Sequence, residues 1–112
     1  MPKYNFVFSG KVIPIEAPKN VNSNEGLLVG DLFGVIGNTA VQGESTELYL
    51  EGVYRLPKSQ DAIDLGQKVY WDEKESLVTA QAQGNRLIGA STQAVKELDP
   101  LVEIKLIGGV IP

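Results

Sequence analysis

The side chains that could do chemistry in this chain are limited by two absences. The 112-residue sequence contains no cysteine and no histidine. Without cysteine there are no disulfides, thiolate nucleophiles or sulfur-ligated metal sites. Without histidine the chain also lacks the commonest metal ligand and the commonest general base near neutral pH, so histidine triads and zinc-dependent hydrolysis are excluded. Carboxylates, glycines and one tryptophan remain as candidates.

Paired carboxylates could act as general acid and base or as calcium ligands. Glu47 and Glu51 are predicted to share one face of a strand, where four residues separate them by about 13 Å. This separation exceeds that of glycosidase carboxylates, so a solvated sheet face is the better interpretation. Asp61 with Asp64, or the acidic residues of 72–75, could offer oxygens to calcium. Neither group has the D-x-D-x-D-G spacing that makes a calcium loop specific.

Phosphate binding is the next candidate, because the chain contains 12 glycines. A phosphate-binding loop needs a lysine followed by Ser or Thr after its second glycine. Gly10-Lys11 is the one Gly-Lys pair, and valine follows it. The spacing of Gly30, Gly34 and Gly37 does not fit the dinucleotide fingerprint G-x-G-x-x-G. We therefore interpret the glycines as turn and strand-bending residues.

Trp71 and the net charge complete the survey of chemistry. Trp71 could stack on a sugar or a base, but an aromatic residue in an alternating strand is more often part of the core, and we predict a core position. The net charge is −4, with 10 basic and 14 acidic residues and no basic cluster. Nucleic acid is therefore an unexpected partner. We predict a protein that is not an enzyme and that uses no metal or cofactor.

Membrane insertion and secretion are not indicated either. The longest apolar stretches, such as residues 32–36, are far shorter than the roughly 20 residues that span a bilayer. The N-terminal segment shows no apolar signal region and no small-residue cleavage site. We expect no membrane partner and synthesis in the cytoplasm of the cell that makes the protein.

The elements that would position these residues are predicted to be strands. Tyr4, Phe6 and Phe8 alternate at strand period and indicate a short aromatic strand or arm. Residues 11–16 form an edge strand, because Pro14 cannot donate to a ladder. Residues 47–56 alternate most clearly and predict one half-buried strand. Further expected elements are strands over 26–30, 32–36, 87–92 and 101–106, a hairpin over 66–72 and 76–80, and one helical turn over 92–98.

Seven or eight short strands, punctuated by Gly, Pro and Asn, predict an all-β fold, either a compact β-barrel or a β-sandwich. Hydrophobic residues make up 43% of the chain and charged residues 21%, which is typical of a globular protein with a packed core. The length suits one domain. We predict an N-terminal arm or first strand over residues 1–10 and a single β domain over residues 11–112.

Both ends of the chain are apolar, whereas most chain ends are polar and mobile. The N-terminal end contains the aromatic residues of 4–8, and the C-terminal end is the segment 107–112. Either both ends form strands of their own fold, or one of them crosses to a neighbouring subunit or surface. The sequence leaves both interpretations open.

Four segments together resemble a family of small tailed-phage and prophage proteins. They occur in the order of that family and cover nearly the whole chain: residues 26–35, 50–58, 66–72 and 87–90. Members often carry the label of a RecA/RadA-type phage recombinase, but their better-supported role is as capsid decoration, or cement, proteins. A recombinase needs a nucleotide site and a DNA-binding surface. This chain has no phosphate loop, a negative charge and too few residues for an ATPase core.

The resemblance implies a protein that binds the outer surface of the assembled phage head and stabilises it. It also implies localisation in the virion, the major capsid protein as partner, and a homotrimer. We place the contact with the capsid or with other subunits on the N-terminal arm and the edge strand. The candidate contact residues are Tyr4, Asn5, Phe6, Val7, Phe8, Lys11, Val12, Ile13 and Ile15.

Two other functions stay open at this stage. The first is a head-fibre or tail structural module that presents a receptor-binding surface, for which Tyr49, Tyr54 and Trp71 would be the contacts. The second is a nucleotide-dependent recombination factor, which the missing phosphate-loop residues make the weakest of the three.

Overall fold

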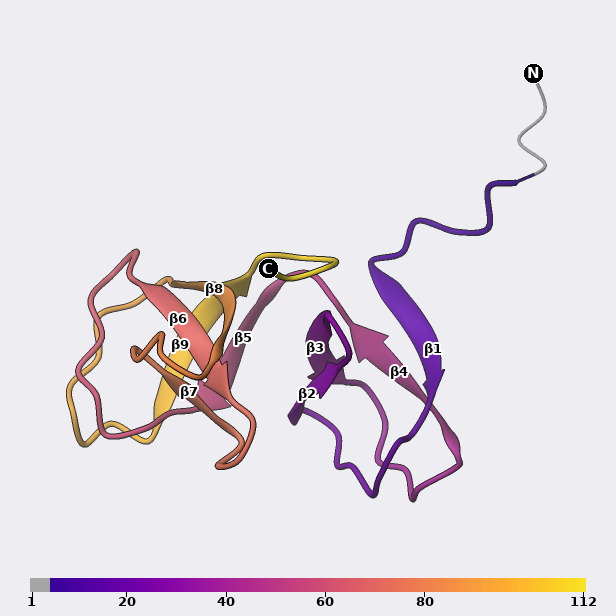
Figure 1. Ribbon diagram of the computed structural model, residues 1–112, viewed down its shortest axis with the longest axis horizontal. Coiled ribbons are helices and arrows are strands. Elements are labelled where there is room, and N and C mark those ends of the chain that lie inside the picture. Colours follow the sequence, from indigo (N-terminus) through magenta and orange to yellow (C-terminus); the bar gives the residue numbers. More distant parts are fainter. Residues whose placement is uncertain (1–4) are drawn as a thin grey trace.

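The computed structural model describes residues 5–112, and over that range it contains nine strands and no helix. The strands form two antiparallel sheets (Figure 1). The all-β prediction is confirmed, and the arrangement is sandwich-like rather than a closed barrel. The strands are β1 Val12–Glu16, β2 Gly26–Val29, β3 Leu32–Ile36, β4 Ser45–Tyr49, β5 Val53–Pro57, β6 Lys68–Asp72, β7 Leu77–Thr79, β8 Arg86–Ser91 and β9 Leu101–Leu106.

The two sheets follow each other along the chain. The first sheet has the strand order β1-β4-β3-β2, and the second has the order β5-β9-β8-β6-β7. An isolated parallel bridge between Lys58 and Val78 brings the two edge strands of the second sheet toward each other. Over the described residues there is no helix with the length and hydrophobicity to cross a bilayer.

The chain passes from one sheet to the other at residues 50–52, so the prediction of one strand over residues 47–56 is wrong. β4 ends at Tyr49 and β5 begins at Val53. Gly52 lies between them with φ +125°, a conformation that L side chains rarely adopt. The glycine lets the chain change direction. As a result Glu47 and Glu51 do not belong to one strand.

The prediction of a helical turn over residues 92–98 is also wrong. Val95 forms an antiparallel bridge with Ile63, in which each residue donates its N–H to the carbonyl of the other, at 2.8 and 3.0 Å. Pairing with a distant loop replaces the local helical hydrogen bonds here. The predicted hairpin is confirmed, because β6 pairs with β7 through a short turn. The edge position of β1 is confirmed as well.

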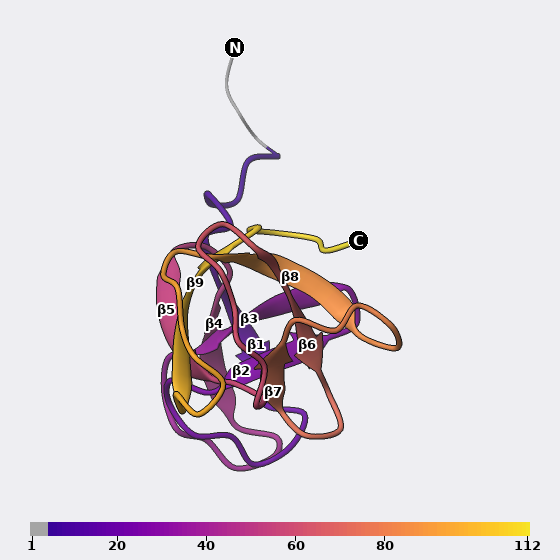
Figure 2. The same ribbon diagram turned by 90° about the vertical axis from the view of Figure 1, so that its left-hand side faces the viewer.

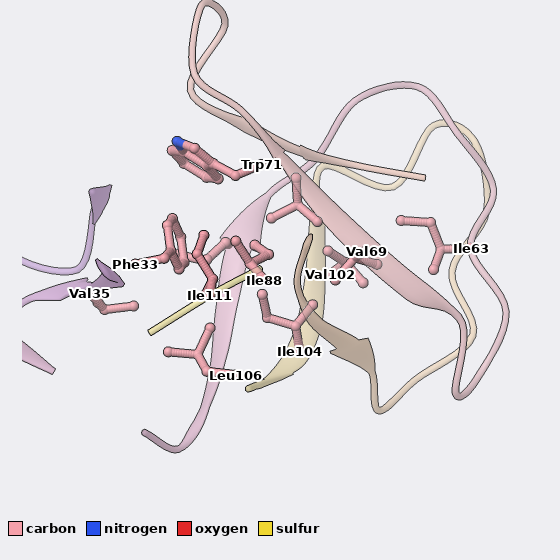
Figure 3. Packing of buried hydrophobic residues seen from close by; sticks show 12 residues of the cluster. Phe33, Val35, Ile63, Val69, Trp71, Ile88, Val102, Ile104, Leu106 and Ile111 are labelled. Atoms are coloured by element: carbon pink, nitrogen blue, oxygen red, sulfur yellow. The ribbon is translucent and has the colours of Figure 1, made fainter. Parts of the chain in front are cut away.

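Each sheet contributes to a separate buried cluster. The first cluster consists of buried side chains of the first sheet and its loops: Ala17, Val21, Leu27, Ile36, Ala40, Leu48 and Leu50. The second cluster is formed mainly by buried side chains of β5–β9 (Figure 3). It also contains Phe33 and Val35 from the first sheet and Ile111 from the C-terminal end. The two sheets are therefore joined by a shared apolar core.

Candidate interaction surface

The N-terminal arm, residues 5–10, extends away from the rest of the molecule (Figures 1 and 2). No strand forms over residues 5–8, so this segment is an arm and not a strand. The exposed fractions are 62% for Phe6, 81% for Val7 and 48% for Phe8, and Asn5 is exposed as well. Tyr4 lies outside the described residues. The arm therefore presents consecutive apolar side chains to any neighbouring molecule.

The predicted contact residues of β1 have different environments. Lys11 is exposed, and Val12 is half-buried. Ile13 and Ile15 are half-buried and pack against the first buried cluster. Their side chains already contribute to the fold, so what β1 offers to a neighbour is mainly its outer backbone edge.

Proline interrupts that backbone edge. Lys11 and Ala17 are both hydrogen-bonded through their backbones to residues flanking β4, at 2.9 and 2.8 Å. Alternate residues of a strand direct their backbone groups to the same side, so Ile13 and Ile15 also bond to β4. Pro14 then faces outward, where it has a carbonyl but no N–H. The outer edge of β1 thus lacks a donor at its centre.

The C-terminal tail, residues 107–112, folds back onto the first sheet. Val110 forms an antiparallel bridge with Leu32, and the Ile111 N–H donates to the Asp31 carbonyl at 2.8 Å. The Ile111 side chain is buried beside Phe33 in the shared core (Figure 3). Of the two apolar ends, the C-terminal one is therefore occupied within its own chain.

Arg86 fixes this tail. Its Nε donates to the Pro112 carbonyl at 2.9 Å, and its Nη2 donates to Asp31 Oδ1 at 2.8 Å and to the Ile111 carbonyl at 3.4 Å. The planar guanidinium suits such a set of acceptors. Sequence reasoning missed Arg86, because Asp31 lies 55 positions away along the chain and no local pattern connects the two residues.

A groove runs between the two sheets along β2. It comprises two adjoining cavities of about 180 and 210 Å³, both lined by Lys19, Gly26, Leu27, Trp71 and Ser76. We call it the β2 groove. The indole of Trp71 is 4% exposed and lies 4.9 Å, centroid to centroid, from the ring of Phe33. The prediction of a core position for Trp71 is confirmed, although its edge borders the groove.

Gly26 is required for this ring pair. A Cβ atom at Gly26 would lie 2.9 Å from Cζ of Phe33 and 2.9 Å from Cη2 of Trp71, which is closer than real Cβ contacts. Any side chain at this position would push the two rings apart. The residues proposed for the receptor-binding alternative are also used internally, since Tyr49 and Tyr54 are half-buried and the Tyr54 hydroxyl donates to the Glu51 carbonyl at 2.9 Å.

The carboxylates considered for calcium instead organise loops. Asp61 Oδ2 accepts hydrogen bonds from the Ser59 hydroxyl at 2.7 Å, the Thr79 hydroxyl at 2.8 Å and the Ala80 N–H at 3.1 Å. The bond from Ser59 contributes most to holding the pKa of Asp61 below its ordinary value of 3.8, and partial burial opposes it. Asp72 Oδ1 accepts two N–H groups in the β6–β7 turn. Residues 5–112 contain no cluster of three or more potential metal ligands.

Comparison with known proteins gives one clear result. The sequence model of a family described as phage cement protein matches residues 7–106. No curated protein and no solved structure gives a significant match. The matched range begins within the arm and includes every strand from β1 to β9. Since it covers well over half of the chain, this protein belongs to the phage cement protein family, and its function is decoration of the phage capsid.

Proposed function

We propose that this protein binds the outer surface of the assembled phage head, with the major capsid protein as its partner. A cement protein stabilises a shell by binding the assembled lattice better than the free subunits, because binding free energy is then lost when the lattice comes apart. The family membership supports this role. The proposal places the protein in the virion after synthesis in the host cytoplasm, and it assigns no catalysis, cofactor or metal.

The observation that carries the proposal is the exposure of the arm. Phe6, Val7 and Phe8 are 62%, 81% and 48% exposed. Adjacent exposed apolar side chains of this kind usually mark an interaction site. The contacts with capsid protein or with other copies would come from the arm and the β1 edge, that is from Tyr4, Asn5, Phe6, Val7, Phe8, Lys11, Val12, Ile13 and Ile15.

A homotrimer at three-fold or quasi-three-fold positions of the lattice completes the proposal. Several copies that bind together add avidity to a weak single contact, provided that the geometry lets them engage at once. Density confined to a vertex or to the tail in electron micrographs of virions would contradict this placement, whereas regular density over the capsid lattice would support it.

The arm is tested by binding to heads that lack the protein. In the test variant, Phe6→Ser, Val7→Ser and Phe8→Ser are combined. Burial of a Phe side chain contributes about 1.5–3 kcal/mol, so we expect at least about a tenfold loss of affinity. The resistance of the decorated heads to heat should fall in parallel.

A matched control removes apolar surface elsewhere. Leu65→Ser combined with Leu98→Ser changes side chains that are 70% and 87% exposed in loops of the second sheet. The control should bind heads as the unmodified protein does. If the control loses binding and the arm variant keeps it, the contact lies on those loops and the assignment to the arm is wrong.

A further inference from the structure

The four-stranded sheet has two edge strands, β1 and β2, and the outer edge of β2 differs from that of β1. β2 and β3 are joined by a two-residue turn between Val29 and Leu32, and the Glu25 carbonyl accepts the Ile36 N–H at 2.9 Å. By strand alternation Glu25, Leu27 and Val29 bond toward β3. Gly26 and Leu28 then direct both their N–H and their carbonyl groups outward. In the described part of the chain β3 is the one strand that pairs with β2, so this edge can accept another strand.

The β2 groove lies alongside this edge and offers space for side chains. Both cavities are bordered by Leu27 and the edge of Trp71; the one of about 180 Å³ is also lined by Pro18, and the one of about 210 Å³ by Pro57. Extended peptides bind such sites by adding a strand to the sheet: backbone hydrogen bonds supply affinity, and alternate side chains fill the cavities. The ligand that fits is therefore an extended segment with apolar residues two positions apart.

The N-terminal arm of the chain has this chemistry. Phe6 and Phe8 are two positions apart and both exposed. The charge is also complementary. Residues 1–15 contain Lys3 and Lys11 and no acidic residue, which leaves 8 of the 10 basic residues and all 14 acidic residues in the rest of the chain. The lining of the β2 groove includes Glu25 and Glu73 as well as Lys19.

The topology favours a groove on a different molecule. β1, which continues the arm, and β2 are opposite edges of the four-stranded sheet. The arm also extends away from the body of its own chain (Figures 1 and 2). An arm that enters the groove of a neighbour makes a head-to-tail contact. Repeated head-to-tail contacts form a closed ring when the rotation from each subunit to the next returns to the first subunit.

We propose that the β2 groove binds the N-terminal arm of a second copy of this chain. In this arrangement the arm adds a strand to β2 through the outward backbone groups of Gly26 and Leu28. Phe6 and Phe8, being two positions apart, then lie on one face of the sheet, the face on which Gly26 and Leu28 border Trp71. The inference refines the proposed function by naming the molecule that receives the arm, and it supplies a physical basis for the homotrimer.

Crosslinking in the full-length protein tests the inference. The photoreactive residue p-benzoylphenylalanine replaces Phe8, and isotope-labelled and unlabelled chains are mixed before irradiation. Mass spectrometry should then find crosslinks to residues 25–28 or 71–76, and these should join labelled to unlabelled chains. The same residue in place of Leu65, which is 70% exposed and lines neither cavity of the β2 groove, is the control and should give no such crosslinks.

A groove variant provides a second measurement. Lys19 is exposed and lines both cavities, so Lys19→Trp should fill the groove while leaving both buried clusters unchanged. We expect self-association, measured by analytical ultracentrifugation, to weaken at least about tenfold. Lys19→Ala, which leaves the cavities open, should associate as the unmodified protein does.

The outcomes separate this inference from the proposed function. If the unmodified chain is monomeric at all concentrations, or if Phe8 crosslinks within one chain or to other residues, arm exchange is wrong. Head binding that still depends on the arm would then leave the proposed function intact. If the crosslinks form as expected but heads are not bound, the proposed function fails and arm exchange stands.

Discussion

The two ends of the chain are similar in composition but differ in where they lie. The C-terminal tail, residues 107–112, pairs with β3, and the buried side chain of Ile111 contributes to the shared core. The N-terminal arm makes no strand over residues 5–8, and its apolar side chains are exposed. An apolar chain end is thus part of the fold when the same chain supplies partners for its backbone and side chains. An apolar end whose side chains stay exposed can instead be covered by another molecule.

The C-terminal tail finds those partners in two separate parts of the sequence. Leu32 and Asp31 of the β2–β3 hairpin pair with its backbone, and Arg86 of β8 bonds to its last carbonyls. The tail therefore holds the first sheet against the second. Changes in the tail should therefore destabilise the fold, whereas changes in the arm should not.

The largest effect on stability is expected at Ile111. The side chain is 5% exposed, so Ile111→Ala leaves a cavity in the shared core. We expect the free energy of unfolding to fall by about 2–3 kcal/mol, measured by urea denaturation. Val7→Ala in the arm is the matched control and should change it by less than about 0.5 kcal/mol. Similar losses for both variants would show that the two ends are structurally equivalent.

A smaller effect is expected at Arg86. Arg86→Ala removes the bond to Asp31 and the bonds to two backbone carbonyls of the tail. We expect a loss of about 1–2 kcal/mol in the free energy of unfolding, together with faster hydrogen exchange at the Ile111 amide. Arg55→Ala is the control, because the Arg55–Glu103 pair at 3.5 Å has an Arg55 side chain that is 70% exposed. If Ile111 exchanges at the same rate in both variants, Arg86 does not hold the tail.

The smallest effect on the free energy of unfolding is expected from a change of pH. It concerns Asp61 in the second sheet, away from both chain ends. The pKa of Asp61 is lower in the folded protein, mainly because the Ser59 hydroxyl donates to the carboxylate. Because this pKa is lower in the folded than in the unfolded protein, ionised Asp61 stabilises the fold at pH values above the unfolded-state pKa. This contribution is lost as the pH falls through the folded-state pKa. Asp61→Asn should therefore be less stable than the unmodified protein at neutral pH.

Acid distinguishes this mechanism from a simple packing defect. The difference in stability between the two proteins should shrink as the pH is lowered below about 3.8, the ordinary pKa of the Asp side chain. Denaturation midpoints at a series of pH values measure it. A difference that stays constant with pH would mean that the charge of Asp61 plays no part.

Local patterns in the sequence were sufficient for several elements. The alternating residues of 66–80 and the short charged turn between them specify a hairpin, and Pro14 places β1 at an edge. Trp71 was predicted to be in the core from its alternation with Tyr70, and it is buried. In each case the information lies within a few residues, where strand periodicity and proline geometry act directly.

Other features depend on contacts that no local pattern contains. The alternation of residues 47–56 continues through Gly52, so the sequence did not show that the chain changes sheets there. The docking of the tail depends on Arg86 and Asp31, which are distant in the sequence. The β2 groove exists because two sheets pack side by side around Phe33 and Trp71. The contact residues of the arm and β1 stay a prediction.

Pro14, in the outer edge of β1, also bears on the solubility of the protein when it is not bound to a capsid. Exposed strand edges can pair with one another and start fibre growth when a protein is concentrated. Pro14 removes the central donor of that edge and so works against such stacking. We therefore expect Pro14→Val to lower the solubility of the protein and to raise its tendency to aggregate.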